Sequence, residues 1–418
     1  MVKKPLKNMY REITAEFFPK QMELSFYDRE DNRQTLLYEK VTWTIAGEDK
    51  GLRYGENPSQ EAALYRLING NLVLGGVSSI EPGRYLASDV ELLQSGKHPG
   101  KINITDVDNA LNIMRYFSDT PCAVIIKHNN PCGAAVGRTL AEAYTKAYMA
   151  DRLAAFGGAV ALNREVDAET ARLIDESYSE VVAAPEFGPG AMDILTRRKN
   201  LRIMRIRSIE KLETFIGTRY LDAKSLIDGG IAVQWSYAPA VLTREDLLPA
   251  VSVFEGKEYG VRRRPTESEY SDIIFGWLVE SGVSSNSVIY VKNGATVGIG
   301  TGEQDRVGVA EIARDKAYRK LADRISWERY GKPFSILQEN GEGSSVLEEV
   351  KERHGGLTGS VMVSDGFFPF RDGVEVGLRE GVSAVVQPGG GVRDFESIEA
   401  CNEYGAAMVF TGERSFKH

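Results

Sequence analysis

The stretch AVIIKHNNPCGAAVG, residues 123–137, contains an apolar run that leads directly into a lysine, a histidine and a tight turn. The apolar run is typical of a buried strand. The chain has only four histidines, and packing gives no reason to place one beside a lysine where such a strand ends. The pair is useful where a proton must move, because histidine titrates near pH ~6.5 and lysine can stabilise developing negative charge.

Lys127 and His128 would point to opposite faces of an ideal strand. The Asn-Asn-Pro turn must therefore break the strand if both side chains are to face one site. The alternative interpretation is a solvated strand end without chemistry, and the residues alone do not decide between the two.

Apolar and amphipathic segments alternate outward from this stretch. The segments expected to be helices are 106–119, 138–152, 167–179, 267–282, 305–325, 370–381 and 393–405. Short apolar strands separate them, a hairpin is expected at Asn293-Gly294, and Asp305 is a plausible N-cap. This alternation predicts an α/β fold with a largely parallel sheet and helices on both faces.

The rhythm weakens in the middle of the chain. We therefore expect an N-terminal extension (1–50), a first α/β domain (51–205), a connecting subdomain (206–265) and a second, similar α/β domain (266–418). A length of 418 residues suits two or three domains with separate cores.

Composition excludes several classes of protein. A net charge of −8 and a pI near 5.4 disfavour a general nucleic-acid surface. No apolar run is long enough for a membrane helix, and Met1–Lys20 lacks the apolar core of a signal peptide. The three cysteines form no CxxC motif, which suits a reducing cytoplasm. The NPCG sequence supplies one cysteine without an H-x-E pair, so no catalytic zinc is expected.

Four further loops carry polar or aromatic side chains that could face a ligand. They are LRYGENPSQ (52–60), GIGTGEQDRV (298–307), SDGFFPFRD (364–372) and QPGGGVRD (387–394). In the first, Arg53 could hold a phosphate with Tyr54 beside it, although a surface turn is the commoner explanation. The second could likewise be only a hairpin exit, and the phenylalanines of the third could fill a domain seam.

Taken together, these motifs resemble the AICAR transformylase portion of the bifunctional purine-biosynthesis enzymes. The motifs that carry the resemblance, in order, are LRYGENPSQ, KHNNPCG, DRLAAFGG, SSNSVIYVKNG, GIGTGEQDRV, SDGFFPFRD and TGERSFKH. The likeness runs from about Leu52 to the last residue. It implies two cytidine-deaminase-like α/β domains around a smaller one, without zinc, and a homodimer with active sites at its interface.

The resemblance also implies a reaction and its residues. The family transfers a formyl group from 10-formyltetrahydrofolate to the 5-amino group of 5-aminoimidazole-4-carboxamide ribonucleotide (AICAR), with His128 as proton acceptor and Lys127 as oxyanion stabiliser or proton donor. The residues expected to bind the nucleotide are Arg53, Tyr54, Gly157, Glu180, Asn286 and Arg414. Those expected to bind the folate are Arg306, Val307, Phe367, Asp372, Gly391 and Val392, with Arg306 and Val307 reaching in from the other subunit.

The chain departs from the family pattern in several ways. The resemblance does not extend to the family's upstream cyclohydrolase domain, so we expect the chain to formylate the nucleotide without closing the ring. Ser59 stands where histidine is usual, Glu303 where a neutral glutamine is common, and Gly366 where alanine is common. These changes leave two alternatives open: a non-catalytic paralogue that binds purine nucleotide or folate, and an IMP cyclohydrolase acting on formyl-AICAR.

Overall fold

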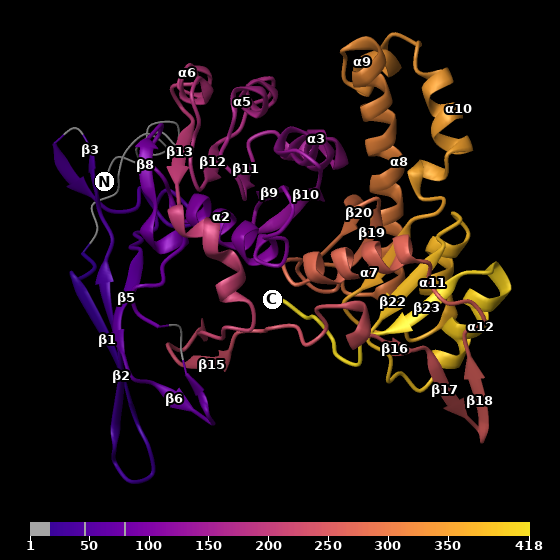
Figure 1. Cartoon of the computed structure of the whole chain (residues 1–418), viewed down its shortest axis with the longest axis horizontal. Helices are drawn as coiled ribbons and strands as arrows, with labels where there is room; N and C mark the ends of the chain where they lie inside the picture. The colour runs from indigo at the N-terminus through magenta and orange to yellow at the C-terminus, as the bar shows by residue number, and fades with distance from the viewer. Residues whose placement is uncertain (1–16, 46, 79–80) are drawn as a thin grey trace. The chain divides into compact units, whose positions relative to one another are not determined.

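The computed structural model describes residues 17–45, 47–78 and 81–418 of the chain. The chain divides into two compact units (Figure 1). Unit 1 comprises the described residues of 1–118 together with 159–238, and unit 2 comprises 119–158 and 239–418. The segment 119–158 thus groups with the C-terminal part of the chain, so these units differ from the predicted domain boundaries at residues 205 and 265. The predicted extension 1–50 lies partly outside the described residues, and its described strands belong to unit 1.

Unit 1 combines a meander with a short α/β layer. The antiparallel meander is β1 (Gln21–Tyr27), β2 (Arg33–Lys40) and β5 (Tyr65–Gly70). The parallel strands β11 (Ala159–Leu162), β12 (Val181–Ala184) and β13 (Arg202–Arg205) have β8 (Glu91–Gln94) antiparallel at their edge. The helices are α2 (Lys101–Met114), α5 (Ala168–Asp175) and α6 (Ala191–Leu195), with 3-10 turns η1 (Ala87–Asp89) and η2 (Arg207–Phe215). The two-stranded pairs are β3 (Trp43–Ile45) with β4 (Glu48–Lys50), β6 (Val73–Leu74) with β7 (Val77–Ser78), and β14 (Leu221–Ser225) with β15 (Ile231–Trp235).

Unit 2 is built on a mixed sheet. Its strand order is β16 (Leu248–Pro249), β23 (Ala407–Phe410), β22 (Ala384–Gln387), β21 (Val361–Ser364), β19 (Val288–Lys292), β20 (Ala295–Gly300), β10 (Asn130–Val136) and β9 (Cys122–Lys127). The helices are α3 (Leu140–Ala150), α4 (Arg152–Ala155), α7 (Glu267–Glu280), α8 (Arg306–Tyr330), α9 (Phe334–Glu339), α10 (Ser344–Glu352), α11 (Arg371–Leu378) and α12 (Asp394–Tyr404). Outside the sheet lie the pair β17 (Val251–Phe254) and β18 (Lys257–Gly260) and the turns η3 (Arg244–Asp246) and η4 (His354–Gly356).

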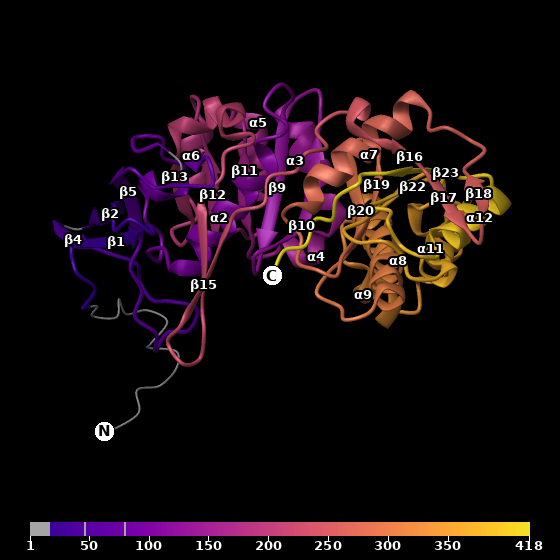
Figure 2. The same cartoon turned by 90° about the horizontal axis from the view of Figure 1, so that it is seen from below.

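Two β-hairpins meet side by side in unit 2, which explains why residues 119–158 belong there. Strand β10 pairs with β20 (Figure 2), where the Val136 amide donates to the Gly294 carbonyl at 2.9 Å. Helix α3 packs so closely on β10 that a Cβ added at Gly133 would lie 2.0 Å from the Ala147 carbonyl oxygen. The same hairpins make the sheet mixed, so the expectation of a largely parallel sheet was wrong: parallel pairing holds in unit 2 only for β21, β22 and β23.

Several local predictions are confirmed. Asn293 and Gly294 form the predicted hairpin turn with φ of +54° and +66°, and Asp272 accepts hydrogen bonds from both of their amides. Asp305 caps α8 by accepting from the Gly308 amide at 2.6 Å. Helix α2 begins earlier than expected, at Lys101, because Gly100 rather than the later Asp106 precedes its first turn.

The element order repeats along the chain. The order helix, hairpin, helix, strand, helix, strand, helix, strand describes α2 to β13 and again α7 to β23, with α4 added in the first block and α9 and α10 in the second. The repeat places β9–β10 and β19–β20 at equivalent positions in their blocks.

Candidate active site

The turn between β9 and β10 breaks the strand at the histidine, which is the condition for Lys127 and His128 to face one site. Lys127 is the last residue of β9, and His128 and Asn129 follow with φ of +54° and +60°. Lys127 is half-buried and its Nζ donates to the Phe156 carbonyl at 2.8 Å, whereas His128 is exposed. The positive φ values take His128 out of the alternation of the strand, so that its side chain need not oppose that of Lys127.

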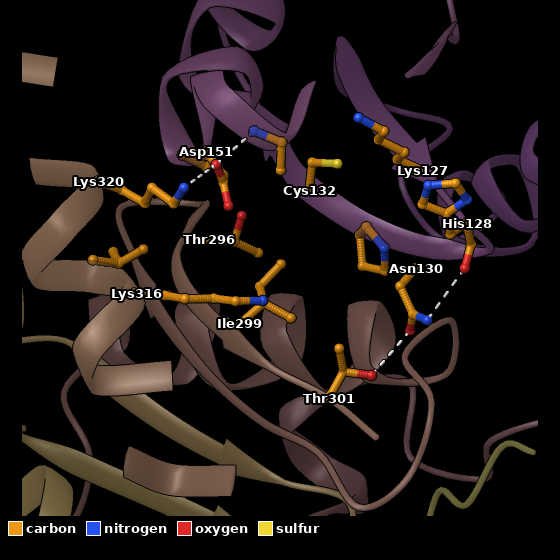
Figure 3. Close-up of a pocket in the computed structure, with 15 residues that line it drawn as sticks. Lys127, His128, Asn130, Cys132, Asp151, Thr296, Ile299, Thr301, Lys316 and Lys320 are labelled. Carbon is orange, nitrogen blue, oxygen red and sulfur yellow. Dashed lines mark hydrogen bonds and ion pairs between the residues drawn. The ribbon is translucent and has the colours of Figure 1, made fainter. Parts of the chain in front are cut away.

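Lys127 and His128 line the same pocket of unit 2, a cavity of about 220 Å³ (Figure 3). We call it the Lys127 pocket. Asn130, which also lines the pocket, connects two neighbouring segments. The Asn130 Oδ1 accepts hydrogen bonds from the Ser284 amide at 2.9 Å and from Thr301 Oγ1 at 3.1 Å. Hence the hairpin that carries the histidine is anchored to the loop before β19 and to the end of β20.

The far side of this pocket is cationic. Lys316 and Lys320 of α8 line it, and Lys320 forms an ion pair with Asp151 at 2.7 Å. Burial lowers the pKa of Lys316, and Asp151 partly opposes that shift. With Lys127 the pocket has three lysines and one carboxylate, which favours an anionic ligand. Sequence reasoning missed these residues; the i, i+4 spacing of the two α8 lysines was their only signal, and it is common on solvated helices.

A second polar cluster of unit 2 brings together Arg306 and Asn286, two of the predicted binding residues. Arg306 Nη2 donates to Asn286 Oδ1 at 2.6 Å, and Nη1 pairs with the carboxylate of Asp365. The Arg306 and Asp365 side chains are only 9% and 0% exposed. Ser285 Oγ also donates to Asp365. We call these four residues the Arg306 cluster.

Glu280 lies beside the Arg306 cluster at the end of α7 and is fully buried. Ser287 Oγ donates to its Oε1 at 2.8 Å. Burial, and next the charge of Asp365, raise the pKa of Glu280 well above its usual value. Glu280 is therefore held in its neutral form over part of the pH range in which an exposed glutamate is ionised.

Gly366 makes room for Arg306. A Cβ added at Gly366 would lie 2.6 Å from Arg306 Nη2. The observed position of the guanidinium therefore depends on the absence of a side chain at Gly366. In this structure Arg306 binds groups of its own chain, and its expected contact with folate in another subunit stays a prediction. Val307, next along α8, is half-buried against the core of unit 2.

Three of the expected folate-binding residues lie in the loops after β21 and β22. Phe367 and Val392 are exposed, and a Cβ at Gly391 would lie 2.8 Å from the Phe367 ring. The Gly391 amide donates to Asp394 Oδ2 at 2.9 Å, which holds the glycine loop against the phenylalanine. Asp372 is exposed in the first turn of α11.

The C-terminal segment approaches both polar clusters of unit 2. The exposed Arg414 places its Cζ 4.8 Å from the centre of the Phe416 ring, and Arg306 Cζ lies 6.0 Å from the same ring. Lys417 Nζ donates to the Asn129 carbonyl at 3.3 Å. The tail is therefore held on the turn that His128 and Asn129 form between β9 and β10, which we call the histidine turn. Gly157, with φ of +79°, follows the residue whose carbonyl accepts from Lys127.

The other predicted residues gather in unit 1, where Arg53 is buried and Tyr54 and Glu180 are partly buried. Arg53 Nη2 donates to the Tyr54 hydroxyl at 2.8 Å, and burial lowers the pKa of Arg53, opposed in part by Tyr54 and Glu180. Glu180 Oε2 accepts from Asn103 Nδ2 at 3.1 Å and pairs with the buried Arg202 at 3.4 Å. Sequence reasoning missed Asn103 and Arg202. Ser59 is exposed, and Glu303 of unit 2 accepts a hydrogen bond from the Gln304 amide.

Two kinds of feature are absent from the described residues. No group of three or more His, Cys, Asp or Glu side chains in this part of the chain could hold a metal ion. None of the helices there is both long and apolar enough to cross a membrane.

Comparison with known proteins gives consistent matches. The sequence model of the family described as "AICARFT/IMPCHase bienzyme" matches residues 9–316. The "Bifunctional purine biosynthesis protein PurH" of Persephonella marina is 39% identical over 368 residues, which cover 88% of this chain and 59% of that protein. The PurH proteins of Anoxybacillus flavithermus and Halalkalibacterium halodurans are 38% and 37% identical, over 91% and 90% of this chain and 61% and 60% of their own lengths. The chain thus spans about three fifths of the length of these curated relatives.

Proposed function

The chain belongs to the AICARFT/IMPCHase family, and we propose that it is the enzyme of purine biosynthesis that transfers a formyl group from 10-formyltetrahydrofolate to AICAR. The observation that carries the proposal is the pocket that both Lys127 and His128 line. A proton acceptor and a cation on one turn are what formyl transfer to a weakly nucleophilic aromatic amine needs.

In the proposed mechanism the 5-amino nitrogen of AICAR attacks the formyl carbon, and a carbon–nitrogen bond forms. His128 accepts the proton that the amine loses, and Lys127 stabilises the negative charge on the formyl oxygen. The bond from the formyl carbon to N10 of the folate then breaks, and N10 takes a proton from Lys127. Tetrahydrofolate and formyl-AICAR leave. No covalent enzyme intermediate is required, so most of the acceleration comes from proximity and acid–base help.

Substrate binding follows the predicted residues. The arginines Arg53 and Arg414 would hold the nucleotide phosphate, and the residues that line its remaining parts would be Tyr54, Gly157, Glu180 and Asn286. The folate would lie on the exposed Phe367 ring and the glycine loop, with Arg306, Val307, Asp372, Gly391 and Val392 around it. The three lysines of the Lys127 pocket support an anionic substrate.

Three broader features are part of the same proposal. The repeated element order supports two cytidine-deaminase-like domains. Membership of the family supports a homodimer with active sites at the interface. A cytoplasmic location suits an enzyme whose three described cysteines are buried and form no disulfide with one another.

The test mixes the purified protein with AICAR and 10-formyltetrahydrofolate and follows tetrahydrofolate release together with product identity. Release of folate with accumulating formyl-AICAR and no IMP is the expected result. Binding of nucleotide without turnover would instead support a non-catalytic paralogue, for which Ser59 and Glu303 are the first residues to revert. Conversion of added formyl-AICAR to IMP would reveal a cyclohydrolase activity.

A further inference from the structure

Unit 1 contains a second cavity, of about 420 Å³, which shares no lining residue with the Lys127 pocket. Strands β2 and β5, helix α2 and the end of η2 form its walls. The lining is rich in leucine and includes four tyrosines and a phenylalanine: Tyr38, Tyr65, Tyr85, Tyr220 and Phe215. This size and this apolar, aromatic lining are typical of sites for small organic molecules, which occupy about 300–1,000 Å³.

Arg115, at the C-terminal end of α2, is the unusual residue of this cavity. It lines the wall but is only 6% exposed. Its Nη1 donates to the Phe215 carbonyl at 3.3 Å, and its Nε is buried without a hydrogen-bond partner among the described residues. No described carboxylate forms an ion pair with it. A buried guanidinium without an anion is costly. The Tyr116 ring, whose centre lies 4.9 Å from Arg115 Cζ, and the helix C-terminus offset only part of that cost.

A second arginine flanks the same phenylalanine. Arg84 lines the cavity with its Cζ 4.8 Å from the centre of the Phe215 ring, and its Nη2 donates to the Thr214 carbonyl. Like Arg115, it has no carboxylate partner among the described residues. The acidic residues of the lining, Glu81 and Asp108, are both exposed. The deeper part of the wall is therefore cationic and the outer part acidic.

Tyr220 adds a hydrogen-bond donor to the wall. Tyr220 as a whole is 43% exposed, but desolvation of its hydroxyl, and next the charge of Asp108, raise the pKa of the hydroxyl to about 12, so it keeps its proton at neutral pH. The cavity thus offers guanidinium and hydroxyl donors to an acceptor group and aromatic faces to a ring.

We propose that this cavity binds a small aromatic carboxylate, with the carboxylate on Arg115 and the ring among Phe215 and the tyrosines. The planar fork of a guanidinium matches a carboxylate, and the bound anion would satisfy the buried Nε. The aromatic lining favours a flat ring over an aliphatic chain. This site is separate from formyl transfer and does not depend on it.

Calorimetric titration of the full chain with 2-naphthoate, and with the uncharged 2-naphthalenemethanol, tests the proposal. We expect the acid to bind about tenfold more tightly than the alcohol, because only the acid can form a charge-assisted, bidentate pair with Arg115. Arg115→Met should remove this preference and leave weak binding of the alcohol unchanged. The matched control is Arg172→Met, an exposed arginine on α5 of the same unit, which should change nothing.

Three results would overturn the proposal: equal binding of acid and alcohol, a preference that survives Arg115→Met, or binding of neither compound by the unmodified chain. If Arg115→Met fails to fold, a second variant, Leu67→Trp on β5, tests the same cavity, because the larger side chain fills it from another lining strand. That variant should lose binding of both compounds. Unchanged binding of 2-naphthoate by a folded Leu67→Trp would place the ligand elsewhere.

Discussion

The histidine turn and the Arg306 cluster lie in the same unit and treat their polar side chains in opposite ways. His128 is exposed on a hairpin turn, whereas Arg306 and Asp365 are 9% and 0% exposed and bonded to each other. An exposed imidazole is available to exchange protons with a substrate and adds little to stability. A buried ion pair cannot be broken without leaving an uncompensated charge, so it holds its neighbours in place. The difference separates residues suited to chemistry from residues suited to positioning.

The largest expected effect is on catalysis. His128→Asn removes the imidazole but keeps a residue that tolerates a φ of +54°. We expect kcat to fall by about 10²–10⁴, the usual contribution of a general base, while nucleotide affinity changes only several-fold. Steady-state kinetics of tetrahydrofolate release and nucleotide titration measure the two quantities.

The control for this variant is His354→Asn, which removes the half-exposed histidine paired with Glu380 in the same unit and keeps a residue that tolerates its φ of +46°. It should leave kcat unchanged. Near-normal kcat in the His128→Asn variant would show that His128 takes no part in the mechanism. The histidine turn would then have only a structural role, as the Arg306 cluster does.

The next effect is on stability. Asp365→Ala leaves the Arg306 guanidinium buried without its carboxylate, and we expect the free energy of unfolding to fall by about 3–5 kcal/mol. The control is Asp315→Ala, which breaks the exposed pair with Arg314 on α8 and should cost no more than about 1 kcal/mol. Denaturant unfolding measures both. If both variants lose the same small amount of unfolding free energy, the buried Arg306–Asp365 pair does not hold its neighbours in place.

The smallest effect is a pH dependence of stability that arises from Glu280, the buried carboxyl beside the Arg306 cluster. The pKa of Glu280 is raised above 4.5 in the folded state, so above pH 4.5 the unfolded chain loses this proton before the folded chain does. The stability of the unmodified protein should therefore fall, relative to Glu280→Gln, by up to about 1.4 kcal/mol per pH unit until the folded pKa is passed.

Urea unfolding of both proteins at a series of pH values above 4.5 measures this difference. Below pH 4.5 the glutamate is neutral in both states, so the difference should be constant there. A difference that stays constant at higher pH, or changes in the opposite direction, would show that burial does not control the charge of Glu280.

Local sequence signals predicted the elements well because they depend on neighbouring residues. The turn at Asn293-Gly294, the Asp305 cap and the break at His128 each follow from one or two residues whose backbone preferences are strong. The prediction of a largely parallel sheet was wrong because strand pairing depends on segments that are distant in the chain. The residues of β10, 130–136, carry no local signal that they will pair with β20.

The candidate site divides in the same way. The sequence by itself determined the α/β class, the repeated order of helices and strands, and the Lys127–His128 pair. All of these depend on short apolar patterns or on residues that are adjacent in the chain. Only the tertiary structure decided that Lys316, Lys320 and Asp151 share the pocket of that pair, that Arg306 binds Asp365 beside Gly366, and that Arg115 is buried in a cavity of its own. The physical reason is that burial and charge pairing are set by which segments pack together, and residues far apart in the chain carry no local mark of that contact.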